Sequence, residues 1–158
     1  MNIENITLNH SITIDEYNDL RASVDFITIR ENRARIALDH SLYTLIAREN
    51  GRPVGMARVV GDGGYVYFIC DVIVRPSHQS QGLGRYIIEH VLSWLESQVD
   101  EGETIMVNLM SALNKEPFYE KLGFHTRPFS DHGSGMSRWI SRCLLYTSPS
   151  PRDPKTSR

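Results

Sequence analysis

A strand-like run, a polar turn and an amphipathic helix follow one another between residues 72 and 98. The run is rich in β-branched residues and breaks at Pro76, and Gly82 and Gly84 stand at the start of the expected helix. A turn of this kind leaves several backbone N–H groups at the helix N-terminus unpaired and pointing the same way. Such groups bind anions, most often phosphate. The segment therefore predicts a phosphate-binding turn.

Residues that are missing from this turn narrow the choice of phosphate ligand. The pattern G-x-x-x-x-G-K-[ST] is absent, so there is no lysine placed to reach a nucleoside triphosphate. The dinucleotide pattern G-x-G-x-x-G begins at Gly82 and Gly84 but has Ile87 in place of the third glycine. What remains is Gln79-x-x-Gly82-x-Gly84, which by itself also fits a surface turn that glycine caps.

A second pattern runs from Asn114 to Phe124 and reads N-K-E-P-F-Y-E-K-L-G-F. Asn114 is a residue typical of a helix N-cap. Phe118 and Leu122 are four positions apart and share one face of the expected helix, whereas Tyr119 points to a neighbouring face. Phe118 and Leu122 are therefore expected to pack against the rest of the protein, whereas Tyr119 is available for another role.

Together, the two patterns resemble those of the GCN5-related N-acetyltransferase (GNAT) family. Gln79-x-x-Gly82-x-Gly84 resembles the family's acetyl-CoA pyrophosphate loop, and F-Y-E-K-L-G-F resembles a later helix, in the same order. The resemblance covers about residues 42–140. It implies an α+β fold, the GNAT fold, with a central mixed, mostly antiparallel twisted sheet and helices on both faces. It also implies acetyl-CoA as cosubstrate and transfer of the acetyl group to a primary amine of a small molecule or peptide.

The resemblance also implies which residues bind the cosubstrate. Acetyl-CoA would lie where the central strand and the next, parallel strand splay apart, near Ile73 and Leu109. The pantetheine arm would pair with the edge of the central strand, and the pyrophosphate would lie against the glycine turn. The cofactor-binding residues carried over by position are Val72, Ile73, Val74, Gln79, Ser80, Gln81, Gly82, Leu83, Gly84, Arg85 and Asn114.

Two residues are the candidates for catalysis, Tyr119 and Asp71. Tyr119 matches the family's tyrosine near the cofactor sulfur, where a phenol can protonate the departing thiolate; the alternative is a packing tyrosine. Some members carry a strand glutamate as base, but the nearest position here is Phe68. Asp71 is the only carboxylate in residues 65–74. It could act as the base directly or through a water molecule, or it could merely satisfy the hydrogen bonding of a backbone group. Direct attack by the amine needs no covalent nucleophile. No histidine is tied to Cys70, so Cys70 is expected in the core rather than as a nucleophile.

A second class of function stays open, a non-catalytic acyl-CoA-binding sensor or interaction module. Tyr119 favours the enzyme, because a sensor needs only the glycine turn. The absence of the strand glutamate keeps the sensor open. The sequence does not identify the acceptor, and an arylalkylamine, a polyamine, an amino sugar and a peptide N-terminus all remain candidates.

Composition limits the partners and the location. The 158 residues, 41% of them hydrophobic, suit one globular domain with a core. The resemblance implies that this is a single N-acetyltransferase domain over residues 1–142. A net charge of −2 favours neither nucleic acid nor an anionic membrane as partner, and no apolar run approaches the length of about 20 residues that spans a bilayer. No metal-ligand spacing is present, so no metal is expected. Two cysteines do not make a disulfide framework, and we expect a cytoplasmic protein; a homodimer stays open.

The last residues, 143–158, resemble the translation of a sequencing adapter or another foreign scar. They are rich in serine and proline, and we expect a disordered tail that plays no part in the fold.

The remaining elements follow from local patterns. Thr13 and Glu16 fit a capping box at the start of a helix that ends near Ser23. The other helices are expected at residues 32–39, 83–98 and from 114 onward. Strands are expected at residues 6–8, 42–48, 53–60, 65–74 and 104–109, with a closing pair at 125–127 and 135–140.

Overall fold

The computed structural model describes residues 2–142, and these residues belong to two compact units. The first unit ends at Met110 and the second begins at Ser111. A single domain through residue 142 therefore stays a prediction. The proposed disordered tail, with Cys143, lies outside the described residues.

The first unit contains a five-stranded sheet in the order β1-β2-β3-β4-β5. Neighbouring strands from β1 to β4 are antiparallel, whereas β5 runs parallel to β4. This arrangement confirms the predicted mixed, mostly antiparallel sheet. The strands are β1 (Ile6–Asn9), β2 (Tyr43–Glu49), β3 (Arg52–Gly61), β4 (Val66–Val74) and β5 (Met106–Leu109).

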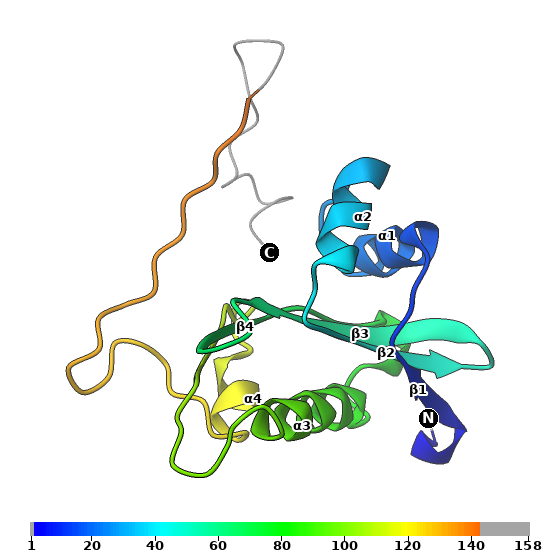
Figure 1. The fold of residues 1–158 in the computed structure, drawn as a ribbon. Helices are drawn as coiled ribbons and strands as arrows, with labels where there is room; N and C mark the ends of the chain where they lie inside the picture. The colour runs from blue at the N-terminus through cyan, green and yellow to red at the C-terminus, as the bar shows by residue number, and fades with distance from the viewer. Residues whose placement is uncertain (1, 143–158) are drawn as a thin grey trace. The chain divides into compact units, whose positions relative to one another are not determined.

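Helices cover both faces of this sheet, as predicted (Figure 1). Helices α1 (Ile14–Ser23) and α2 (Glu31–Asp39) lie over one face, and α3 (Leu83–Glu96) lies over the other. Two short 3₁₀ helices, η1 (Ile3–Asn5) and η2 (Pro76–His78), precede β1 and the glycine turn. Each of the three α-helices lies within two residues of its predicted bounds.

Local sequence accounts for the helices of this unit. The hydroxyl of Thr13 accepts from the backbone N–H of Glu16, and the Glu16 carboxylate accepts from the N–H of Thr13, both at 3.1 Å. This reciprocal pair confirms the capping box at the start of α1. The predicted apolar face of α3 is mostly buried, at Leu83, Ile87, Ile88, Val91 and Leu95. Leu92, which belongs to the same predicted face, is half-buried, and Val99 lies beyond the end of the helix.

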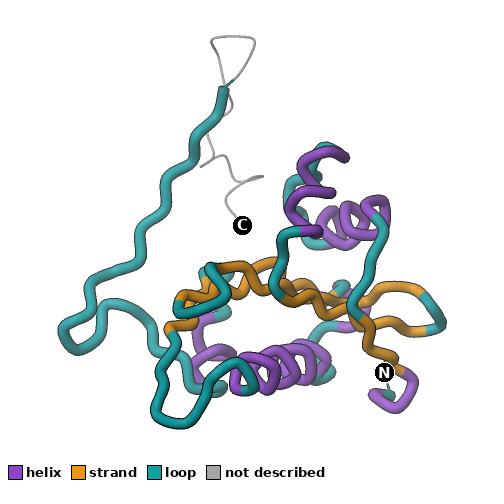
Figure 2. Tube along the Cα trace, viewed as in Figure 1, coloured by secondary structure: helices purple, strands orange, loops and turns teal. Residues whose placement is uncertain are grey.

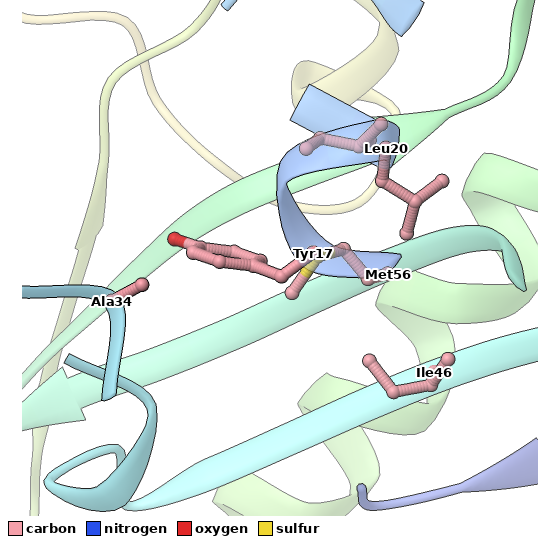
Figure 3. Close-up of a cluster of buried hydrophobic side chains, with 6 residues drawn as sticks. Tyr17, Leu20, Ala34, Ile46 and Met56 are labelled. Atoms are coloured by element: carbon pink, nitrogen blue, oxygen red, sulfur yellow. The ribbon is translucent and has the colours of Figure 1, made fainter. Parts of the chain in front are cut away.

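One hydrophobic core lies between the sheet and the helices α1 and α2. Figure 3 shows Tyr17 and Leu20 of α1 together with Ala34 of α2, Ile46 of β2 and Met56 of β3. Ile73 of β4 completes the cluster, and all six residues are at most 1% exposed. The core therefore joins both helices to three strands.

A β-bulge interrupts β4. Its Cys70 lies opposite Arg58 of β3, and Ile73 lies opposite Met56, so β4 has one residue more than β3 between these pairs. Asp71 takes a positive φ of 50° at this point. One extra residue reverses which face the following side chains point to.

This reversal decides which face of the sheet each half of β4 supplies. Before the bulge, the Tyr67 ring packs edge-on against Trp94 of α3, with ring centroids 6.2 Å apart. After the bulge, Ile73 packs in the core under α1 instead. An uninterrupted strand would place residues 67 and 73 on the same face.

The second unit contains one short helix, α4 (Glu116–Glu120), and is otherwise loop in residues 111–142 (Figure 2). The predicted closing strands at 125–127 and 135–140 are therefore wrong for the described chain. Apolar residues in a row are not enough for a strand, which also needs a hydrogen-bonding partner. The one bridge in this region is an isolated pair, Phe129 with His132.

The start of α4 also differs from the prediction. Lys115 occupies the N-cap position without a side-chain cap, whereas Asn114 stands one residue earlier with a φ of 67°. Asparagine tolerates the left-handed region better than most residues, so Asn114 makes the turn before the helix instead of capping it.

Candidate active site

The open edge of β4 is the first feature of the candidate site. The β4–β5 ladder ends at the pair Ile69–Leu109, but β4 continues to Val74. Within residues 2–142, no strand pairs with the stretch 70–74 on the β5 side. The backbone of Val72, Ile73 and Val74 can therefore pair with an extended ligand there.

The glycine turn follows this edge directly. The Gln79 side-chain amide donates to the backbone oxygen of Val74 at 2.9 Å, and the Gln81 amide donates to that of Ser77 at 3.2 Å. These bonds fold the turn back against the end of β4. Ser80 and Gly82 take positive φ angles of 61° and 88°. Two left-handed residues in so short a span give the tight reversal that leads into α3.

The N-terminus of α3 offers backbone donors without a side-chain cap. Gly82 is the N-cap residue, and the first helical bond runs from the N–H of Tyr86 to the Gly82 oxygen at 3.0 Å. The N–H groups of Leu83, Gly84 and Arg85 precede that bond and belong to the helix's orphan donors. Leu83 is 1% exposed and anchors the turn to the core, whereas the exposed Arg85 pairs with Glu89 at 2.7 Å. The turn therefore has the features of an anion site.

The basic residues before the turn have structural partners. Arg75 is 6% exposed, donates from Nε to the Pro53 oxygen at 2.7 Å, and forms an ion pair with Asp19 of α1. His78 lies 3.0 Å from the Glu49 carboxylate. These contacts tie the end of β4 and the start of the turn to β3, α1 and β2.

Asp71, the candidate base, lies in the β4 bulge within a polar cluster. Its Oδ1 accepts from Arg21 at 2.6 Å, and its Oδ2 accepts from Arg58 at 2.9 Å and from the Tyr17 hydroxyl. Both oxygens thus hold α1 and β3 against the bulge. The arrangement assigns Asp71 a positioning role for the β4 edge, and its action as a base stays a prediction.

Cys70 precedes the bulge and is mostly buried. Burial raises the pKa of its thiol to about 11. A thiol with this pKa carries its proton at neutral pH and is a weak nucleophile. This state suits the expected packing role.

Tyr119 and Asn114 belong to the second unit. The Tyr119 ring packs edge-on against Phe118 and Phe124, with centroids 5.0 and 6.0 Å away, and is 9% exposed. Burial raises the pKa of Tyr119 to about 12, so the phenol keeps its proton over the whole physiological range. A general acid needs this protonated form.

The comparison with known families decides the class of protein. Residues 9–124 match the model of the acetyltransferase (GNAT) family. The chain belongs to this family. This membership shows the GNAT fold of the sheet and its helices, which the two motifs predicted, and it shows the predicted acyltransferase enzyme.

Several known proteins are similar to this GNAT chain over most of its length. Serotonin N-acetyltransferase 2, chloroplastic, from Oryza sativa subsp. japonica is 34% identical over 88% of this chain and 68% of its own length. The uncharacterized N-acetyltransferase ycf52 from Pyropia yezoensis is 30% identical over 87% of this chain and 77% of its own. A GNAT family acetyltransferase from Streptococcus pneumoniae, SP0256, has a structure with a TM-score of 0.70 at 29% identity, covering 87% of this chain and 97% of its own.

Some residues of the site were missed by sequence reasoning. Tyr17, Arg21 and Arg58 meet at Asp71 although they lie 54, 50 and 13 positions from it. No spacing in the sequence signals this cluster. Among residues 2–142, no group of three or more His, Cys, Asp or Glu side chains is placed to hold a metal ion, and no described helix is long and apolar enough to cross a membrane.

Proposed function

We propose that this enzyme transfers the acetyl group of acetyl-CoA to a primary amine of a small molecule or peptide. The observation that carries the proposal is the continuity of the open β4 edge at Val72–Val74 with the turn at residues 79–82 and the uncapped N-terminus of α3. The edge would pair with the amide groups of pantetheine, and the helix N-terminus would bind the pyrophosphate. Amine transfer is supported by the name of the rice relative, a serotonin N-acetyltransferase.

The chemistry is a direct transfer. The neutral amine nitrogen attacks the thioester carbonyl carbon and forms a tetrahedral intermediate, whose collapse breaks the C–S bond. The CoA thiolate takes a proton, for which Tyr119 is the proposed donor, and the new amide nitrogen loses one. Positioning of the two substrates supplies most of what this reaction needs.

The test measures binding and turnover separately. Calorimetric titration should show that acetyl-CoA binds to the purified protein. Free thiol should then appear when acetyl-CoA is mixed with serotonin, spermidine, glucosamine or a short peptide, above the rate of acetyl-CoA alone. Absence of binding would refute the donor site, whereas binding without thiol release from any amine would refute the amine acceptor. The rice relative is named as chloroplastic, and the cytoplasmic location of this enzyme stays a prediction.

A further inference from the structure

Two arginines share a single carboxylate beside the β4 bulge. Arg21 of α1 and Arg58 of β3 each donate to one oxygen of Asp71, at 2.6 and 2.9 Å. The side chains of all three residues are at most 11% exposed. We call Arg21 and Arg58 the arginine pair. Its charges are thus largely withdrawn from water.

The cluster carries one positive charge in excess. Burial raises the pKa of Tyr17 to about 12 and that of Cys70 to about 11, so both neighbours are neutral at pH 7. Within the described part of the chain, Asp71 is the only carboxylate that forms an ion pair with either arginine. A charge shielded from water is costly unless an opposite charge lies close to it. The cluster therefore favours an additional anion.

Each arginine also has one nitrogen available for that anion. Arg21 uses Nε for the Ile27 oxygen and Nη1 for Asp71. Arg58 uses Nε for Asp71, and its Nη1 donates to the Ala37 oxygen and the Ser41 hydroxyl. Neither Nη2 donates to a group within residues 2–142, and neither is sealed from solvent. Planar guanidinium groups with free N–H donors match a carboxylate well.

The position of the cluster connects it to the acceptor. Asp71 immediately precedes Val72, the first residue of the edge proposed for the pantetheine arm, and consecutive Cα atoms lie about 3.8 Å apart. An acceptor amine has to approach the acetyl group carried by that arm. We propose that the acceptor is an amino acid whose carboxylate binds to the arginine pair. This inference rests on the proposed acetyl transfer and specifies its substrate class.

Matched substrates test the proposal. Tryptophan and tryptamine, 5-hydroxytryptophan and serotonin, tyrosine and tyramine, and lysine and cadaverine differ within each pair only by the carboxylate. We expect kcat/KM to be at least about tenfold higher for the amino acid in one or more pairs, since a bond to a charged group has this order of effect. The amide of the preferred amino acid, which keeps the size but not the charge, should behave like the decarboxylated amine. Equal or better use of the decarboxylated amine in every pair would overturn the proposal.

Variants locate the effect. Arg21→Gln removes the excess charge but leaves Asp71 paired with Arg58, so the cluster keeps a neutral ion pair and the protein should fold. Its preference for the carboxylate should fall to less than about threefold, mainly through KM, while Arg21→Lys should retain part of it. Arg35→Gln is the matched control, because it removes an equal charge from an exposed site on α2 where Arg35 pairs with Glu31. A carboxylate preference that survives in Arg21→Gln and in Arg58→Gln would overturn the assignment to this pair.

Binding measurements separate this inference from the proposed function. The affinity of each amino acid is measured by calorimetry on the protein saturated with CoA and on the protein alone. If acetyl-CoA binds and other amines are acetylated while no amino acid binds or reacts, the proposed function holds and this inference fails. If acetyl-CoA does not bind, the donor site fails, and weaker amino-acid binding by Arg21→Gln than by the wild type would still support the carboxylate site. If no amino acid binds to the wild type in that case, the carboxylate site is refuted as well.

Discussion

Gly55 of β3 lies directly beneath Ile87 of α3. A Cβ atom added to Gly55 would stand 2.7 Å from Cδ1 of Ile87 and 3.0 Å from the backbone oxygen of Ile73. The absence of a side chain at this position lets α3 approach the sheet closely. Helix α3, which begins at Leu83, is therefore positioned by a glycine 28 residues earlier in the chain.

Gly55→Ala is expected to destabilise the protein by about 1–3 kcal/mol, because the added methyl group overpacks the contact between α3 and β3. The free energy of unfolding in urea measures this. Gly133→Ala is the control, since a Cβ there meets nothing within 4 Å and the effect on the unfolded chain is the same. Adding Ile87→Val to Gly55→Ala should recover part of the loss. Equal stability of Gly55→Ala and Gly133→Ala would contradict the close approach.

Glu16 should give the protein a stability that depends on pH. The hydrogen bonds from Arg48, at 2.7 and 3.0 Å, lower the pKa of Glu16 from 4.5 to about 2. Because the folded-state value is the lower one, the stabilisation is present above pH 4.5 and is lost as the pH falls towards 2. Glu16→Gln should lower the free energy of unfolding by about 1 kcal/mol at pH 7 and by less at pH 3. The figure is small because Glu16 is partly exposed and solvent screens its ion pair with Arg48. Urea unfolding at both pH values measures the difference, and a constant difference would mean that the carboxylate charge contributes nothing.

Gly84→Asp should weaken the binding of acetyl-CoA at least about tenfold, or about 1.4 kcal/mol, because a carboxylate would face the pyrophosphate at the start of α3. An acidic residue in the first turn of a helix suits the helix dipole, so the fold should remain. Ser93→Asp places the same charge on an exposed position further along α3 and serves as control. Calorimetric titration that finds unchanged affinity in a folded Gly84→Asp variant would remove the pyrophosphate assignment.

Tyr119→Phe should lower kcat by about 10²- to 10⁴-fold with little change in the affinity for acetyl-CoA, because the ring stays and only the proton donor is lost. The pKa of about 12 keeps the phenol protonated, so the wild-type rate should not fall between pH 7 and 9 through loss of this proton. Steady-state kinetics with an accepted amine measures both effects. Tyr65→Phe, at an exposed tyrosine, is the control. A wild-type rate in Tyr119→Phe, with chemistry limiting, would make Tyr119 a packing residue.

The sequence by itself determined the features that depend on neighbours along the chain. The capping box of Thr13 and Glu16, the apolar face of α3 and the glycine turn at Gly82 each involve residues a few positions apart, and local geometry decides them. The positions of the strands up to β5 along the chain were also predicted to within two residues of their observed bounds. The last two predicted strands failed because pairing depends on a partner far along the chain.

Only the tertiary structure decided the role of Asp71. In the sequence it is the single carboxylate of a strand and a candidate base. In the fold it is the bulged residue at which Arg21 and Arg58 meet, and these groups come from α1, β3 and β4. A salt bridge requires that its partners lie within a few ångströms in space, and separation along the chain carries no information about this. The excess charge of the arginine pair, and the carboxylate we expect it to bind, therefore became visible only when the chain was folded.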